Sequence, residues 1–91
     1  MGRNFCGMKY TLNKQGPGRW LIVDEANNEA GSAWLSPIKK WNVFNYHLRT
    51  QYIGDVDHRD FALRLWAANR IIQSGGKETI KRITKKEVEM T

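Results

Sequence analysis

The sequence predicts an α+β fold in which a three-stranded antiparallel sheet packs against one C-terminal helix. Two strand-like segments flank a turn at residues 13–18, a third ends at Gly54, and a helical pattern follows from residue 58 to about residue 73. A chain of 91 residues buries only about 60% of its unfolded surface, which is enough for one core. We therefore expect one domain at residues 1–74, with an insertion between strands two and three, and a basic, mobile tail at residues 75–91.

The first hairpin is predicted by strand formers on both sides of a turn. The first strand is expected at residues 6–12. Residues 19–24 are rich in β-branched and aromatic side chains, and Gly16-Pro17-Gly18 can form the connection. Residues 1–5 are expected to be a short arm. Residues 20–23 are all apolar, so alternation does not show which face of the second strand is buried.

The insertion leaves two alternatives open. Residues 25–32 are polar and rich in turn formers, which predicts a loop. Ser36-Pro37 is typical of a helix start, whereas residues 42–46 alternate like a strand, so residues 33–46 are compatible with either. The third strand is expected at residues 46–53. Four aromatic residues of the insertion predict either a satellite core or an exposed docking patch for another protein: Trp34, Trp41, Phe44 and Tyr46.

The main helix is predicted to begin after Asp57, whose carboxylate can accept hydrogen bonds from the free amides of the first turn. Gly75-Gly76 is expected to stop it. Trp20 and Trp66 are expected in the core because the domain has little other apolar area. The spacing of apolar residues predicts that the inner face of the helix carries Phe61, Leu65, Ala68 and Ile72. The tail could alternatively form a short amphipathic helix.

Composition indicates the class of partner. The net charge of +6 and the isoelectric point near 9.8 suit phosphate backbones or anionic lipid. No apolar run approaches the roughly 18 residues of a membrane span, so we expect a cytoplasmic protein without membrane contact. Cys6 is the single cysteine, and His47 and His58 lack a ligand pattern, so no metal or other cofactor is expected. No catalytic motif is present, which argues against an enzyme.

The order of elements resembles the plant-type ethylene-response-factor (APETALA-like) DNA-binding domain and the related arm-binding domain of lambda-type phage integrases. The matching positions cover roughly two thirds of the chain and are Gly7, Gly18-Arg19-Trp20, Ile53-Gly54, Ala62, Arg64 and Trp66. About twenty additional residues between the second and third strands depart from that family. The resemblance implies a small phage or mobile-element protein that places its sheet in the major groove of double-stranded DNA, as a regulator or recombination accessory.

The resemblance also implies which residues contact DNA. Lys9 and Tyr52 match contact positions, and Thr50 shares the face of Tyr52 by alternation. Lys14 and Arg19 flank the hairpin turn and are expected to reach phosphates. The helix would then pack behind the sheet, with its arginines toward solvent. Two other functions stay open: a module that binds a host or phage protein through the aromatic insertion, and binding of single-stranded RNA or DNA by stacking on tyrosines.

Overall fold

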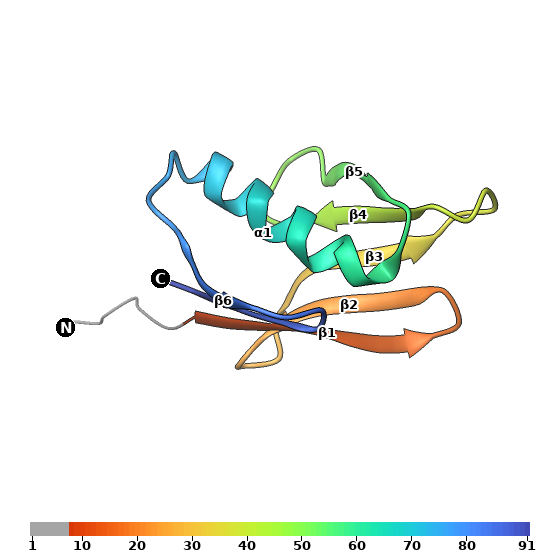
Figure 1. Ribbon diagram of the computed structural model, residues 1–91, viewed down its shortest axis with the longest axis horizontal. Helices are drawn as coiled ribbons and strands as arrows, with labels where there is room; N and C mark the ends of the chain where they lie inside the picture. Colours follow the sequence, from red (N-terminus) through yellow and green to blue (C-terminus); the bar gives the residue numbers. More distant parts are fainter. Residues whose placement is uncertain (1–7) are drawn as a thin grey trace.

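The computed structural model describes residues 8–91, which form a seven-stranded antiparallel sheet curled around one helix (Figure 1). The strand order is β5-β4-β3-β2-β1-β7-β6. The prediction of a three-stranded sheet backed by a C-terminal helix is therefore wrong, and with it the fold that the resemblance implied. The expected arm at residues 1–5, and Cys6 and Gly7 of the first predicted strand, lie outside the described residues.

The first five strands form a meander, in which each strand pairs with the next along the chain. They are β1 (Met8–Gly16), β2 (Arg19–Asp24), β3 (Glu29–Leu35), β4 (Trp41–Asn45) and β5 (Tyr52–Val56). A short 3₁₀ helix, η1 (Arg59–Phe61), leads into helix α1 (Ala62–Gln73). The chain then returns to the other end of the sheet as β6 (Ile80–Ile83) and β7 (Glu87–Met90), and β7 pairs with β1.

The second strand has the predicted bounds, but the predicted loop at residues 25–32 is wrong. A tight turn is enough, because the Asp24 carboxylate accepts hydrogen bonds from the backbone N–H groups of Ala26 at 2.9 Å and Asn28 at 2.8 Å. Asn27 takes the left-handed conformation there, with φ of 68°. The sheet therefore resumes at Glu29, where a loop was expected.

The insertion is a continuation of the sheet. Ser36-Pro37 does not start a helix; it lies in the turn between β3 and β4, where the Ser36 N–H donates to the Lys40 carbonyl at 2.7 Å. The alternating segment that follows is strand β4. The third predicted strand at residues 46–53 is also corrected, because residues 46–51 connect β4 to β5 and the strand begins only at Tyr52.

Residues 80–90, within the segment expected to be a mobile tail, form the β6–β7 hairpin. Val88 lies opposite Tyr10, and Met90 lies opposite Met8. Val88 is fully buried and Met90 is only 2% exposed. These two side chains are too few to predict a core face within the tail alone, but β1 supplies the apolar neighbours that make them part of the core.

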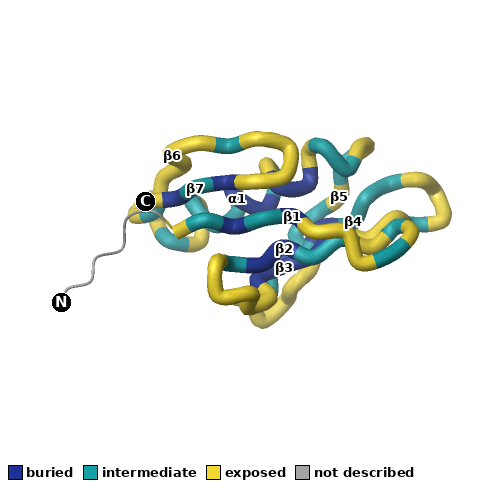
Figure 2. The backbone as a smooth tube through the Cα atoms, turned by 90° about the horizontal axis from the view of Figure 1, so that it is seen from below, coloured by how far each residue is buried: buried dark blue, intermediate teal, exposed yellow. Residues whose placement is uncertain are grey.

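Helix α1 covers the concave face of the sheet and contacts β4 and β5 at one end and β7 near the other (Figure 1). The predicted inner face is wrong, since Phe61 is 51% and Ile72 is 72% exposed. Alanines let the helix approach the strands closely, whereas larger side chains at those positions would hold it away. The buried residues of α1 are Ala62, Leu63, Trp66 and Ala67. Figure 2 shows that burial is concentrated along the middle of the strands, while the hairpin tips are exposed.

Trp66 is the largest fully buried side chain, as expected from the sequence. Its indole Nε1–H donates to the Ala30 carbonyl at 3.1 Å, and its ring lies 4.7 Å from that of Tyr10. Gly31 makes room for it, because a Cβ there would be 2.6 Å from the indole nitrogen and 2.4 Å from the Phe44 carbonyl oxygen. Trp66 can thus pack against β3 only because position 31 has no side chain.

The cap of the helical segment differs from the prediction. His58 occupies the N-cap of η1, and its Nδ1 accepts from the Asp60 N–H at 3.1 Å. Asp57 instead forms a hydrogen bond and ion pair with Lys40, which lowers the pKa of the Asp57 carboxyl. Asp57 thereby ties the β3–β4 turn to the segment before the helix.

We predict that Gly31→Ala destabilises the protein by about 3 kcal/mol, because an overpacked site must displace either the indole or a strand. Thermal melting measures the loss. Gly16→Ala is the matched control, since a Cβ at Gly16 has no atom within 4 Å and its φ is not positive. The control should stay within about 0.5 kcal/mol of the parent. If Gly31→Ala and the parent have the same melting temperature, the close contact between Trp66 and β3 is contradicted.

We predict that Met90→Ala costs about 2 to 5 kcal/mol of stability, as expected for a buried methionine. Ile80→Ala on the neighbouring strand is the control, and it should cost about 1 kcal/mol or less because Ile80 is already 37% exposed. Denaturant unfolding of both variants compares them. If Met90→Ala and the parent unfold at the same denaturant concentration, the β6–β7 hairpin does not belong to the folded core in solution.

Candidate functional site

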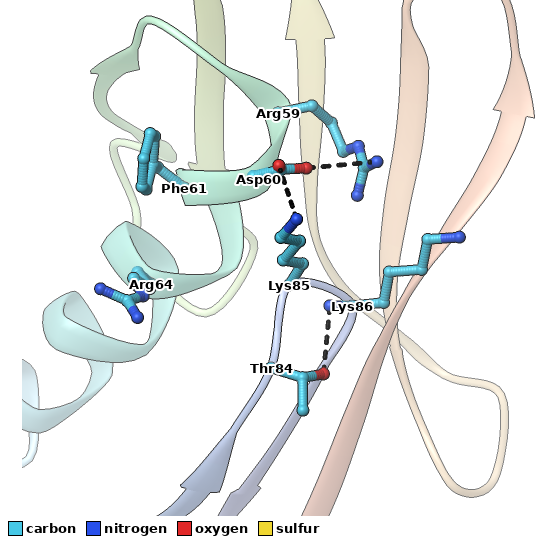
Figure 3. Close-up of a pocket in the computed structure, with 7 residues that line it drawn as sticks. All are labelled: Arg59, Asp60, Phe61, Arg64, Thr84, Lys85 and Lys86. Carbon is cyan, nitrogen blue, oxygen red and sulfur yellow. Dashed lines mark hydrogen bonds and ion pairs between the residues drawn. The ribbon is translucent and has the colours of Figure 1, made fainter.

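A basic pocket lies where the start of the helical segment meets the β6–β7 turn (Figure 3). Its volume is about 790 Å³. Figure 3 shows one wall formed by η1 and the first turn of α1, and the other by the tip of the hairpin. Four of its seven lining residues are cationic and one is a carboxylate: Arg59, Asp60, Phe61, Arg64, Thr84, Lys85 and Lys86.

The β6–β7 turn is held in place by its threonine and by β1. The Thr84 hydroxyl accepts hydrogen bonds from the backbone N–H groups of Lys86 at 3.3 Å and Glu87 at 3.0 Å. The Leu12 N–H donates to the Lys86 carbonyl at 2.7 Å. These bonds fix the backbone that carries Lys85 and Lys86 beside the helical segment.

Positive charge exceeds negative charge in this pocket. Asp60 lies 3.3 Å from the Arg59 guanidinium and 3.4 Å from the Lys85 ammonium, so one carboxylate is shared between two cations. Among residues 8–91, neither Arg64 nor Lys86 forms an ion pair with a carboxylate. The pocket therefore keeps uncompensated positive charge that can attract an anion.

Trp20 of β2 contacts two cations of the pocket. The Arg59 guanidinium lies over its indole ring at 4.3 Å, and the Lys86 ammonium lies 5.7 Å from the ring centroid. Lys14 is directly opposite Trp20 in the β1–β2 ladder, so both side chains project from the same face of the sheet. The positive surface thus extends from the pocket to Lys14. We call Lys14, Arg59, Arg64, Lys85 and Lys86 the basic end.

The five residues predicted to contact DNA are not brought together. Lys14 belongs to the basic end. Thr50 is exposed in the β4–β5 connection, outside the strand that was expected to orient it. Lys9, Arg19 and Tyr52 lie on the opposite, outer face of the sheet, where Lys9 forms an ion pair with Glu87 at 3.6 Å.

The outer face is aromatic. Arg19 lies over the Trp34 ring at 4.7 Å, and the ring of Tyr52 lies 5.7 Å from that of Phe44. A hollow of about 230 Å³ is lined by Trp34, Phe44 and Tyr46, with Ser32 and Gln51. Trp41 differs from its three aromatic neighbours in the insertion, because it packs against the core. The insertion therefore contributes both to the core and to an exposed surface.

Charge on the outer face is close to balanced, because acidic side chains of β7 accompany its cations. Glu87 pairs with Lys9, and Glu89 pairs with Arg82 at 2.9 Å. The sheet that would have to dock is also a different one, because the resemblance implied three strands and the structure has a curled sheet of seven (Figure 1).

Only part of the basic end can be predicted from the sequence. The arginines of the helical segment were expected to face solvent away from any ligand, and Lys85 and Lys86 were assigned to a mobile tail. A signal was present in the run Thr84-Lys85-Lys86, which is compatible with a basic turn. Its position beside Arg59 and Arg64 depends on β7 pairing with β1, which is a contact between the two ends of the chain.

Within residues 8–91, no three His, Asp or Glu side chains gather in a way that could hold a metal ion. No helix of these residues is long and apolar enough to cross a membrane. The chemistry of the two surfaces therefore has to identify the function, since the chain matches no protein-family model, no curated protein and no solved structure.

Proposed function

We propose that this protein binds nucleic acid through its phosphate groups, with the basic end as the contact surface. The observation that carries this proposal is that four cationic side chains, from the helical segment and the β6–β7 turn, line a pocket with a single carboxylate, while Lys14 of β1 lies opposite Trp20 on the same face of the sheet. Three separate parts of the chain supply the cations, and the sheet and helix hold their backbones in place. A rigid arrangement of this kind suits a repeated anion such as the phosphate backbone.

Arginine and lysine contribute differently to such a surface. Arg64 offers a planar fork of donors that can bind one phosphate with two hydrogen bonds, whereas Lys85 and Lys86 act as mobile point charges. Arg59 is less free, since its guanidinium lies over Trp20 and pairs with Asp60. Arg64 and the two lysines are therefore the residues that we assign to phosphate contact, while Arg59 holds the Asp60 carboxylate.

A second candidate function is binding of another protein by the outer face. Trp34 and Tyr52 are exposed and Phe44 and Tyr46 are half-buried beside them. This surface favours the second function, because accessible aromatic side chains with balanced surrounding charge are typical of protein interfaces. The two functions use opposite faces of the sheet. Variants of one face can therefore be tested without disturbing the other.

We predict that binding to nucleic acid weakens steeply with salt, and that Arg64→Gln with Lys86→Gln lowers the slope. Each lost phosphate contact should reduce the log-log slope by about 0.9 for duplex and about 0.7 for a single strand. Fluorescence anisotropy of labelled 20-mers, titrated at several salt concentrations, measures this slope. Both single-stranded and duplex probes are needed.

The matched control is Lys39→Gln with Lys77→Gln, which removes the same charge from exposed positions outside the pocket. The control should leave the slope unchanged. Equal effects of the two double variants would show that binding follows net charge and not the basic end. Absence of binding by the parent at low salt would contradict a nucleic-acid function and leave the outer face as the candidate.

We predict that Trp34→Ala and Tyr52→Ala leave nucleic-acid affinity unchanged, because both side chains lie on the face opposite the basic end. They should also cost about 1 kcal/mol or less in stability, since Trp34 is 42% and Tyr52 is 49% exposed. Anisotropy and thermal melting of the same samples check both points. A loss of affinity in either variant would show that the outer face of the sheet, and not the basic end, contacts the nucleic acid.

A further inference from the structure

The basic pocket has a feature that phosphate binding does not use. Phe61 lines it, and its aromatic side chain is half exposed. Figure 3 shows Phe61 and Arg64 on the same wall and Lys85 reaching toward that wall from the β6–β7 turn. Lys86 extends the other way (Figure 3), with its ammonium 5.7 Å from the Trp20 ring. The pocket therefore offers an aromatic surface beside its cations.

The backbone that carries the Phe61 ring is held in place by η1. Phe61 is the last residue of η1, and its N–H donates to the His58 carbonyl at 3.0 Å. The imidazole of His58 lies 6.4 Å from the ring, nearly perpendicular to it. Because the backbone is fixed on both sides, the ring can serve as a stacking surface with little further loss of conformational freedom.

We propose that the pocket binds one unpaired nucleotide of a nucleic-acid strand, with its base against Phe61 and its phosphate against Arg64 and Lys85. This inference rests on the proposed function, because both place phosphate against the same cations. It goes further by naming the substrate class as single-stranded nucleic acid. In a duplex the face of each base is covered by its neighbours, so only an unpaired base can stack on a protein ring.

The size of the pocket agrees with this ligand. Its volume of about 790 Å³ lies within the range of roughly 300 to 1,000 Å³ that small-ligand sites have in proteins. An inorganic phosphate would occupy only part of it. The apolar stems of the lysines and arginines add to the surface that a base and sugar can cover.

The first test compares three probes on the full chain: adenosine 5′-monophosphate, adenosine and inorganic phosphate. Amide chemical shifts locate binding, and titration gives each affinity. We expect the nucleotide to shift resonances of residues 59–64 and 84–86, and to bind at least about tenfold more tightly than phosphate, which corresponds to about 1.4 kcal/mol. Equal affinity for nucleotide and phosphate would overturn the inference, since the ring would then contribute nothing.

The second test uses variants of the ring and the charge. Phe61→Leu should lose the advantage of nucleotide over phosphate and keep the affinity for phosphate, whereas Arg64→Gln should weaken both. Tyr52→Leu is the matched control, because it removes a similarly exposed aromatic ring from the outer face. An unchanged nucleotide affinity in Phe61→Leu, or an equal loss in Tyr52→Leu, would overturn the assignment of the base to Phe61.

The third test separates this inference from the function on which it rests. Phe61→Leu should weaken binding of a single-stranded 20-mer about tenfold and leave a duplex of the same length unaffected. If both probes bind the parent in a salt-dependent way and Phe61→Leu changes neither, the nucleotide site is wrong while the phosphate contact survives. If neither probe binds the parent at low salt, the proposed function and the nucleotide site both fail.

Discussion

The contact between Trp66 and the backbone of β3 is the constraint on which the rest of the structure depends. The indole lies where Gly31 has no side chain, and its N–H is satisfied by the Ala30 carbonyl. The ring also packs against Tyr10 on β1, so one side chain joins the helix to two separate strands. Burial of so large a ring without a hydrogen-bond acceptor would be costly, which explains why the carbonyl and the glycine occur side by side.

The position of the helix decides where the tail can fold. Arg70, on the same helix, lies 5.3 Å from the Trp66 ring and 5.4 Å from the Tyr10 ring, and it forms a two-pronged ion pair with Glu78 at 3.0 and 2.8 Å. That pair directs the chain toward β6 immediately after the helix ends. The hairpin then pairs with β1, so that Val88 and Met90 join Tyr10 and Leu12 in the core. The basic pocket is a consequence, because the hairpin tip reaches the start of the helical segment.

The molecule separates two kinds of surface on the two sides of one sheet. Cations gather on the helix side around Trp20, where Asp60 is the single carboxylate of the pocket. On the outer side, carboxylates of β7 balance the cations, and aromatic rings are exposed between β3 and β5. Alternation puts Lys14 and Trp20 on the helix side of the sheet and Lys9, Arg19 and Tyr52 on the other. The helical segment and the β6–β7 turn supply the remaining cations of the basic end. The net charge of +6 is therefore unevenly distributed, with one basic surface and one that is nearly neutral.

The sequence by itself determined the local elements: the bounds of β2, the helix near residues 62–73, the burial of Trp66 and the basic character of the chain. Propensity, periodicity and composition depend on neighbours in sequence, so these properties can be predicted from one chain. The tertiary structure decided the number of strands, the inner face of the helix and the basic end. Val88 and Met90 have no apolar partners until β1 lies beside them, and Lys85 has no relation to Arg64 until that pairing forms. Contacts of this kind join residues far apart in the chain, so local sequence patterns do not predict them.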